Sequence, residues 1–242
     1  MKSASQILIL VCSAVFTLHS SLAQWVQTSG PHGGSVPCFA GSGGNIYAYT
    51  GLSGLFQSTD GGRSWHVVNN SPSLLGGYAL AITDGNIFAG AGTVLVSSDS
   101  GSSWTESSNG LPRGTVQSLI SFDGNLFAGV ISNGISISTN NGKNWTAVNN
   151  GLPSANTSIY TFTAIDTLLF AGGYKGVFLS TDKGTSWSAA GLADSVVNAL
   201  SVSGGNIFAV TNGGGVFLST DNGKNWSLTN DGLPDTVTSL IA

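Results

Sequence analysis

STDNGKNW, at residues 219–226, decides the fold of this chain because four other stretches repeat its pattern. All five begin with Ser and carry Gly at the fifth position and Trp at the eighth, and four of them have Asp at the third. The other copies are STDGGRSW (58–65), SSDSGSSW (97–104), STNNGKNW (138–145) and STDKGTSW (180–187). A catalytic group is rarely needed in five copies, whereas a turn is needed once in every structural unit of a repeat protein. We therefore interpret the stretch as a structural loop.

The spacing of the copies predicts a β-propeller. Their tryptophans are 39, 41, 42 and 39 residues apart, which is the length of a four-stranded blade. In the third unit, apolar runs at 116–122, 126–131 and 135–139 are separated by DGN and SNG turns, and a fourth run begins at Trp145. Such turns favour antiparallel hairpins with positive φ. Radial packing of these sheets gives their apolar faces a shared core, so we predict an all-β propeller of four-stranded antiparallel blades, with a stacked solenoid as the alternative.

The two ends of the repeat region predict an incomplete further blade. Complete units run from a strand at 36–40 to one at 226–229, which gives five blades. The segment 25–30 matches the last strand of a unit, and 236–242 matches the first strand. We expect the propeller domain to span 24–242, the chain to be a fragment of a longer protein or an open arc, and a complete ring to have at least six blades.

The N-terminus and the composition indicate an exported protein. Lys2, an apolar run from Ile7 to Leu18 and a small-residue ending predict a signal peptide at residues 1–23. No later run is long enough for a membrane helix, so we expect no membrane insertion and a secreted, periplasmic or cell-surface location. Cys38, alone in the mature chain, is expected to be a buried, unreactive thiol. A net charge of −4 with 7% charged residues argues against nucleic-acid binding.

The repeated motif S-x-D-x-G-x-x-W resembles the Asp-box, or BNR repeat, of sialidases, sortilin-type receptors, xyloglucan-cleaving propellers and photosystem II assembly-factor-like propellers. The resemblance implies a propeller in which the boxes lie away from the active face. From the residues themselves, we expect a hairpin between the third and fourth strands of each blade. The Asp carboxylate would accept N–H groups one or two residues on, Gly would supply positive φ, and Trp would cover the hairpin or fill the gap between blades.

The third copy of the box argues for a structural role, because Asn140 replaces the acid there. An amide oxygen can cap a turn but cannot act as a general acid. The residues to which we assign this structural role are Asp60, Trp65, Asp99, Trp104, Asn140, Trp145, Asp182, Trp187, Asp221 and Trp226.

Enzymatic chemistry has few candidate residues outside the boxes. The sialidase resemblance would require three arginines, and the chain has only Arg63 and Arg113. Hydrolysis of the xyloglucanase type needs two carboxylates about 5–9 Å apart across a cleft. Asp194 and Asp235, in equivalent loops between blades, are weak candidates for such a pair, although Asp before a strand is ordinary turn chemistry. No spacing of ligands predicts a metal site, and no cofactor is expected.

The loops between blades and those between second and third strands are expected to share one face. Their exposed candidates for ligand binding are Tyr49, Arg113, Tyr174 and Lys175, which could bind a glycan or a peptide end. We therefore predict a secreted, non-catalytic binding or scaffold module, monomeric, with a glycan or an extracellular protein as partner. The alternative is a glycoside hydrolase, xyloglucanase-like or sialidase-like, with part of its site outside this chain.

Overall fold

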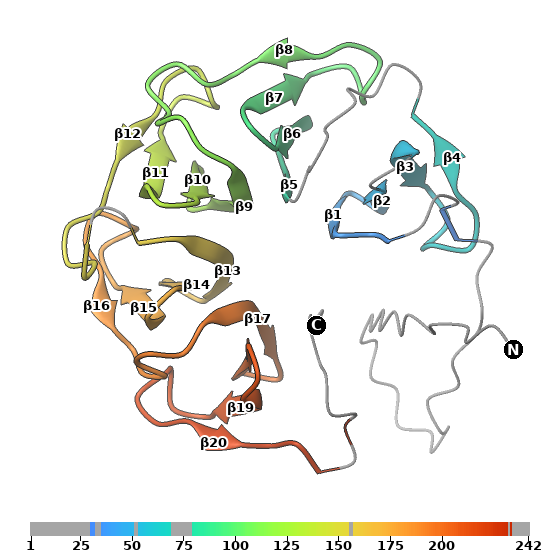
Figure 1. Ribbon diagram of the computed structural model, residues 1–242. Coiled ribbons are helices and arrows are strands. Elements are labelled where there is room, and N and C mark those ends of the chain that lie inside the picture. The colour runs from blue at the N-terminus through green and yellow to red at the C-terminus, as the bar shows by residue number, and fades with distance from the viewer. Residues whose placement is uncertain are drawn as a thin grey trace, which may run out of the picture.

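The computed structural model describes residues 30–31, 35–50, 53–68, 79–154, 157–231 and 233. In this part of the chain, strands form five four-stranded sheets, which confirms the predicted β-propeller of antiparallel blades. Figure 1 shows the sheets around a common centre, with the first strand of each innermost and the fourth on the rim. This radial arrangement rules out the stacked solenoid. The predicted signal peptide and the predicted strands of a further blade lie outside the described residues, apart from Gly30.

Every blade consists of four consecutive strands. The first blade contains β1 (Cys38–Ser42), β2 (Asn45–Thr50), β3 (Gly54–Ser58) and β4 (His66–Val67), and the second contains β5 (Ala79–Thr83), β6 (Asn86–Gly90), β7 (Val94–Ser97) and β8 (Thr105–Glu106). The third contains β9 (Val116–Phe122), β10 (Asn125–Val130), β11 (Gly134–Ser138) and β12 (Thr146–Ala147). The fourth contains β13 (Ile159–Ile165), β14 (Leu168–Gly173), β15 (Gly176–Ser180) and β16 (Ser188–Ala189), and the fifth contains β17 (Val197–Ser203), β18 (Asn206–Thr211), β19 (Gly215–Ser219) and β20 (Ser227–Leu228). The described residues include no helix, and so none that is long and apolar enough to cross a lipid bilayer.

Two-residue turns join the first and second strands of each blade. In four of the five turns both central residues have positive φ, as in the third blade, where Asp123 has φ 50° and Gly124 has φ 75°. These values match the tight hairpins that Asp-Gly and Gly-Gly sequences favour. The turn chemistry read from the sequence therefore sets the register of the inner pair of strands in each blade.

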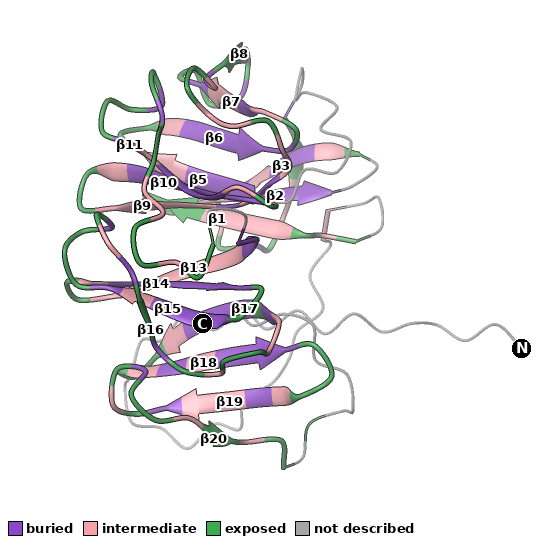
Figure 2. Ribbon diagram, turned by 60° about the vertical axis from the view of Figure 1, so that its left-hand side comes forward, coloured by how far each residue is buried: buried purple, intermediate pink, exposed green. Residues whose placement is uncertain are grey.

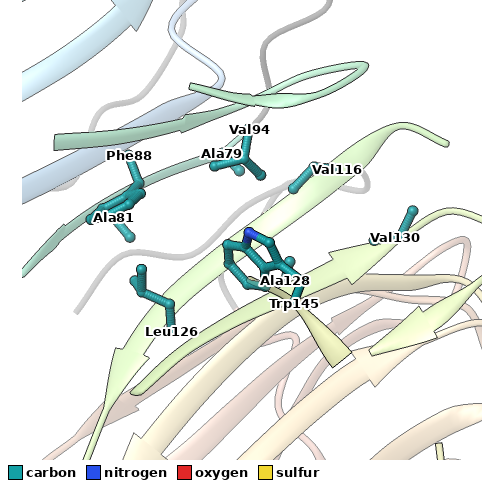
Figure 3. Packing of buried hydrophobic residues seen from close by; sticks show 9 residues of the cluster. All are labelled: Ala79, Ala81, Phe88, Val94, Val116, Leu126, Ala128, Val130 and Trp145. Atoms are coloured by element: carbon teal, nitrogen blue, oxygen red, sulfur yellow. The ribbon is translucent and has the colours of Figure 1, made fainter. Parts of the chain in front are cut away.

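The core lies between neighbouring blades rather than inside any one of them. Figure 3 shows the cluster between the second and third blades, in which Phe88 of β6 and Trp145 both take part. Similar clusters join the first blade to the second, the third to the fourth and the fourth to the fifth. The second strands are the most deeply buried, and Phe88, Phe127 and Phe170, whose blades have a neighbour on both sides, have no exposed surface. In Figure 2, buried residues accordingly follow the strands and exposed residues gather in the hairpins.

The inner strands of the third, fourth and fifth blades each contain a β-bulge. The inner strand has seven residues and pairs with six on the second strand, so one residue is left without a partner. The unpaired residues are Gln117, Tyr160 and Asn198, as the breaks in register show. A bulge turns the extra side chain away from the regular alternation of the strand. Three successive blades therefore carry the same backbone irregularity at the same place.

Candidate binding face

The Asp-box hairpins are closed by their own side chains, as the fourth blade shows. The Ser180 hydroxyl donates to Asp182 Oδ1 at 2.8 Å and accepts the Gly184 N–H at 2.7 Å. Asp182 Oδ1 also accepts the Ser186 N–H at 2.9 Å, and Oδ2 accepts the Ser186 hydroxyl at 2.5 Å. The carboxylate thus bonds the residue four positions on, and not one or two as we expected, because the two residues after it turn with positive φ and bring the fourth residue back.

The other boxes repeat this network, including the one that lacks an acid. Asp60, Asp99 and Asp221 accept the N–H of the residue four positions on at 2.8–2.9 Å. Asn140 accepts the Asn144 N–H at 2.9 Å and the Ser138 hydroxyl at 3.1 Å. An amide oxygen therefore closes the same loop, which supports the structural assignment of the motif.

Hydrogen bonds within the boxes keep the acids ionised. The pKa values of Asp99, Asp182 and Asp221 are lowered to about 2, mainly by a hydrogen bond from the side chain four positions on. This donor is a serine hydroxyl for Asp99 and Asp182 and the Asn225 amide for Asp221. The Ser64 hydroxyl has the same effect on Asp60, whose pKa lies well below its usual range. An acid that is ionised at every physiological pH has no proton to donate, so these carboxylates are poorly suited to general acid catalysis.

The tryptophans of the boxes tie three blades to the preceding ones. The indole N–H of Trp145 donates to Ser107 O at 2.7 Å, that of Trp187 to Val148 O at 3.0 Å and that of Trp226 to Ala190 O at 2.7 Å. Trp65 and Trp104 instead donate to the glycine carbonyl of their own box, at 3.1 and 2.9 Å. Both roles that we considered for the tryptophan, covering the hairpin and filling the gap between blades, therefore occur.

Loops between blades and loops between second and third strands meet on one face, as the sequence analysis assumed. Lys175, between β14 and β15, forms an ion pair of 3.0 Å with Asp194, in the loop before β17. Both side chains are exposed, and the Lys175 ammonium also lies 5.5 Å from the centroid of the Tyr174 ring. In the third blade, Asn133 Nδ2 donates to the carbonyl of Arg113, whose side chain is exposed.

Of the sequence-predicted site residues, Tyr49 lies in the core and Asp235 lies outside the described residues. Tyr49 is only 3% exposed and belongs to the core between the first two blades, so our expectation that it is exposed is wrong. β2 packs against the second blade, and its last four residues are all buried. Asp235 lies outside the described residues, and its predicted partner Asp194 pairs with Lys175.

The remaining ionisable and metal-binding groups are dispersed. Asp123 pairs with Lys183 at 2.8 Å, and Glu106 accepts the Thr93 hydroxyl at 3.0 Å. Within the described ranges, no three His, Cys, Asp or Glu side chains come together as metal ligands would. Cys38 is half-buried rather than buried as we expected. Desolvation raises the pKa of its thiol to about 12, so the unreactive protonated form prevails.

The bulged residues Gln117, Tyr160 and Asn198 were not among the predicted site residues. Asn198 is exposed, and Gln117 and Tyr160 are half-buried, although they lie in strands whose neighbouring residues are largely buried. The available signal was strand length, since the inner strand has one residue more than the strand that it pairs with. That signal depends on strand boundaries, which sequence patterns locate only approximately.

Solved structures share the fold at low sequence identity. The extracellular domain of a hybrid two-component system from B. thetaiotaomicron aligns with 80% of this chain and 27% of its own length, at 15% identity and a TM-score of 0.65. The GH74 enzyme of Niastella koreensis aligns with 84% of this chain and 33% of its own, at 22% identity and a TM-score of 0.62. YCF48 bound to D1 peptide aligns with 82% of this chain and 67% of its own, at 16% identity and a TM-score of 0.57. The chain thus spans about a third or less of the first two proteins, and these likenesses show the fold alone.

Family models give a more specific result. No curated protein matches the sequence. The BNR/Asp-box repeat model matches residues 217–228, which include the whole fifth box. The model of the DUF6242 beta propeller domain matches residues 32–177, more than half of the chain. The chain therefore belongs to the DUF6242 beta propeller domain family.

Proposed function

We propose that the protein is a secreted, non-catalytic binding or scaffold module whose ligand is an extracellular glycan or protein. The observation that carries this proposal is that most of the described carboxylates are already bonded to other groups of the protein. The box carboxylates bond their own loops, Asp123 pairs with Lys183, and Asp194 pairs with Lys175. A glycoside hydrolase needs two carboxyl groups facing each other across its substrate. Acids that are already engaged in this way favour binding over hydrolysis.

The rigidity of the fold supports a recognition role. Successive blades share clusters of buried side chains, and indole hydrogen bonds join the last three blades to their predecessors. A platform of this kind holds its loops in fixed positions, which reduces the entropy lost on binding. The loop face offers exposed Arg113, Tyr174 and Lys175 to a partner.

The structural neighbours are compatible with this role. One is an extracellular domain and another is bound to a peptide, whereas a third is a GH74 enzyme. A fold of this type supports unrelated functions, so the choice rests on the site residues. A hollow of about 150 Å³ between β15–β16 and the fifth box is smaller than the roughly 300–1,000 Å³ of typical small-molecule sites. We place the ligand on the exposed loop face.

A binding assay combined with a hydrolysis assay tests the proposal. The full-length chain, expressed with its N-terminus so that export can be followed by cell fractionation, is applied to glycan and peptide arrays. Any glycan that binds is then incubated with the protein, and reducing ends are measured. We expect export and binding without new reducing ends. Turnover that disappears in Asp194→Asn and Asp235→Asn, but persists in the control Asp123→Asn, would establish the hydrolase instead.

A further inference from the structure

The three bulged residues occupy equivalent positions around the centre of the propeller. Each follows a residue that packs on the preceding blade: Val116 lies against Gly90, Ile159 against Gly129 and Val197 against Gly172. The inner strands β9, β13 and β17 are the edges nearest the centre in Figure 1. The three bulges therefore lie at the same height in three successive blades, near the loop face where the inner strands begin.

The surroundings of these residues indicate that they are available to a ligand. Val116 and Ser118, on either side of Gln117, are buried, as are Val197 and Ala199 beside Asn198. Because the flanking side chains fill the space between blades, the accessible side chain of the bulge lies on the free inner edge of its sheet. Within the described ranges, the side chains of Gln117, Tyr160 and Asn198 make no hydrogen bond, so their polar groups are left to solvent.

The backbone is the same in the three blades, but the side chains differ. Residues that stabilise the fold, such as the Ser, Gly and Trp of the boxes, are the same in every repeat of this chain. The bulged position instead holds Gln in the third blade, Tyr in the fourth and Asn in the fifth. A bulge often re-aims a side chain beside a functional site. The combination of a recurrent backbone feature with varied, unbonded polar side chains points to recognition.

The chemistry of the three side chains selects an uncharged ligand that is rich in hydroxyl groups. Each carboxamide offers a donor and an acceptor side by side, which suits neighbouring hydroxyls. The tyrosine adds a flat apolar ring with a polar tip. None of the three carries a charge at neutral pH, so they provide no attraction for an anion. We propose that Gln117, Tyr160 and Asn198 form a binding row for a neutral glycan chain.

The spacing of the row fits a chain of linked sugars. Neighbouring inner strands approach within 8 Å between Cα atoms, and the three residues stand on three successive blades, so a ligand that contacts all of them must extend along the inner edges of these blades. A single monosaccharide would reach only one or two of them. This inference rests on the proposed binding function and narrows it to one site and one class of ligand.

Affinity gel electrophoresis tests the row with defined polymers. The full-length protein is run through gels that contain xyloglucan, galactomannan or mixed-linkage glucan as neutral polymers, or polygalacturonate as an anionic one. Isothermal titration with oligosaccharides of the retarding polymer then gives Kd. The variants are Tyr160→Ala, Tyr160→Phe and Gln117→Ala/Asn198→Ala. The control is Leu228→Ala, which removes an exposed side chain from the rim strand β20. Tyr174→Ala tests the loop face separately, and thermal unfolding checks that every variant folds.

We expect a neutral polymer to retard the protein. Tyr160→Ala and the double variant should weaken binding at least about tenfold, a loss of roughly 1.4 kcal/mol. Tyr160→Phe should retain most of the affinity because the ring stays, and the rim variant Leu228→Ala should bind as the wild type does. Oligosaccharides that are too short to span two blades should bind more weakly than longer ones.

Three outcomes would overturn the inference, and they differ in what they mean for the proposed function. If a neutral glycan binds but only Tyr174→Ala weakens it, the binding module stands and the row is wrong. If only polygalacturonate or an array peptide binds, the module again stands, and the ligand class is wrong. If neither the gels nor the arrays show any ligand, both the row and the proposed binding function fail.

Discussion

Gly184→Ala should destabilise the protein by about 2–5 kcal/mol because it meets two separate obstacles. Gly184 is the glycine of the fourth box and has φ +83°, a conformation that costs roughly 1–2 kcal/mol for a residue with a Cβ. Its Cβ would also lie 2.2 Å from Phe127 Cε1, in the core of the preceding blade. Phe127 is fully buried and cannot move aside, and overpacking of this kind costs about 1–3 kcal/mol.

Gly124→Ala provides the matched control. Gly124 has φ +75°, but a Cβ there would meet nothing within 4 Å, so only the conformational cost of roughly 1–2 kcal/mol applies. The entropy that alanine removes from the unfolded chain is common to both variants and cancels in the comparison. The difference between them isolates the contact between the third and fourth blades.

Urea unfolding followed by tryptophan fluorescence measures this difference as a shift in midpoint at constant m-value. In a Phe127→Ala background, which removes the obstructing ring, Gly184→Ala should cost no more than Gly124→Ala does in the wild type. Equal destabilisation by Gly184→Ala and Gly124→Ala in the wild type would refute the view that the box glycine is a packing element between blades.

Three further predictions concern the boxes. Trp145→Phe leaves the buried Ser107 carbonyl without its donor and should cost about 1–3 kcal/mol, more than Trp65→Phe, whose indole bonds its own loop; calorimetry that ranks them in reverse would contradict this. Asp182→Asn should lower Tm less than Asp182→Ala, since the Asn140 amide oxygen accepts the equivalent N–H group in the third box. Equal losses of Tm in the two variants would count against the network. A pKa of about 2 in the folded state, against about 3.9 when unfolded, means that the ionised box acids stabilise the fold above pH 4 and lose this effect between pH 4 and 2. Tm should therefore fall less steeply over that window in Asp182→Asn than in the wild type, and parallel curves would exclude the linkage.

The architecture could be predicted from the sequence because its determinants are local. The spacing of the box tryptophans gives the blade length, and Asp123-Gly124 gives a hairpin whose φ values the structure confirms. The hydrogen bonds of the box were predicted with the wrong register, because two successive residues with positive φ bring the fourth residue back to the carboxylate. The hydrogen-bonding preference of the Asp side chain alone does not predict which N–H group a loop with two such residues brings to it.

The burial of Tyr49 could not be predicted from its own strand. The sequence NIYAYT places it beside a turn, where exposure is the ordinary expectation, but the second blade packs against this strand. Burial there is a property of the ring, and it depends on residues about 30 to 40 positions away, such as Leu80 and Ala91. The bulges at Gln117, Tyr160 and Asn198 depend likewise on how two strands of unequal length are paired.

The two ends of each blade are therefore under different physical constraints. At the box end, the glycine must approach the preceding blade and the serine must bond two groups at once, so little variation is compatible with the packing. At the opposite end of the third, fourth and fifth blades, the bulge takes one residue out of the ladder, and its side chain is exposed or half-buried, so fewer contacts constrain its identity. A repeat protein can vary its ligand at such positions at a lower cost in folding than at the boxes. This freedom is the physical reason to look for recognition at Gln117, Tyr160 and Asn198 rather than at the more noticeable Asp-boxes.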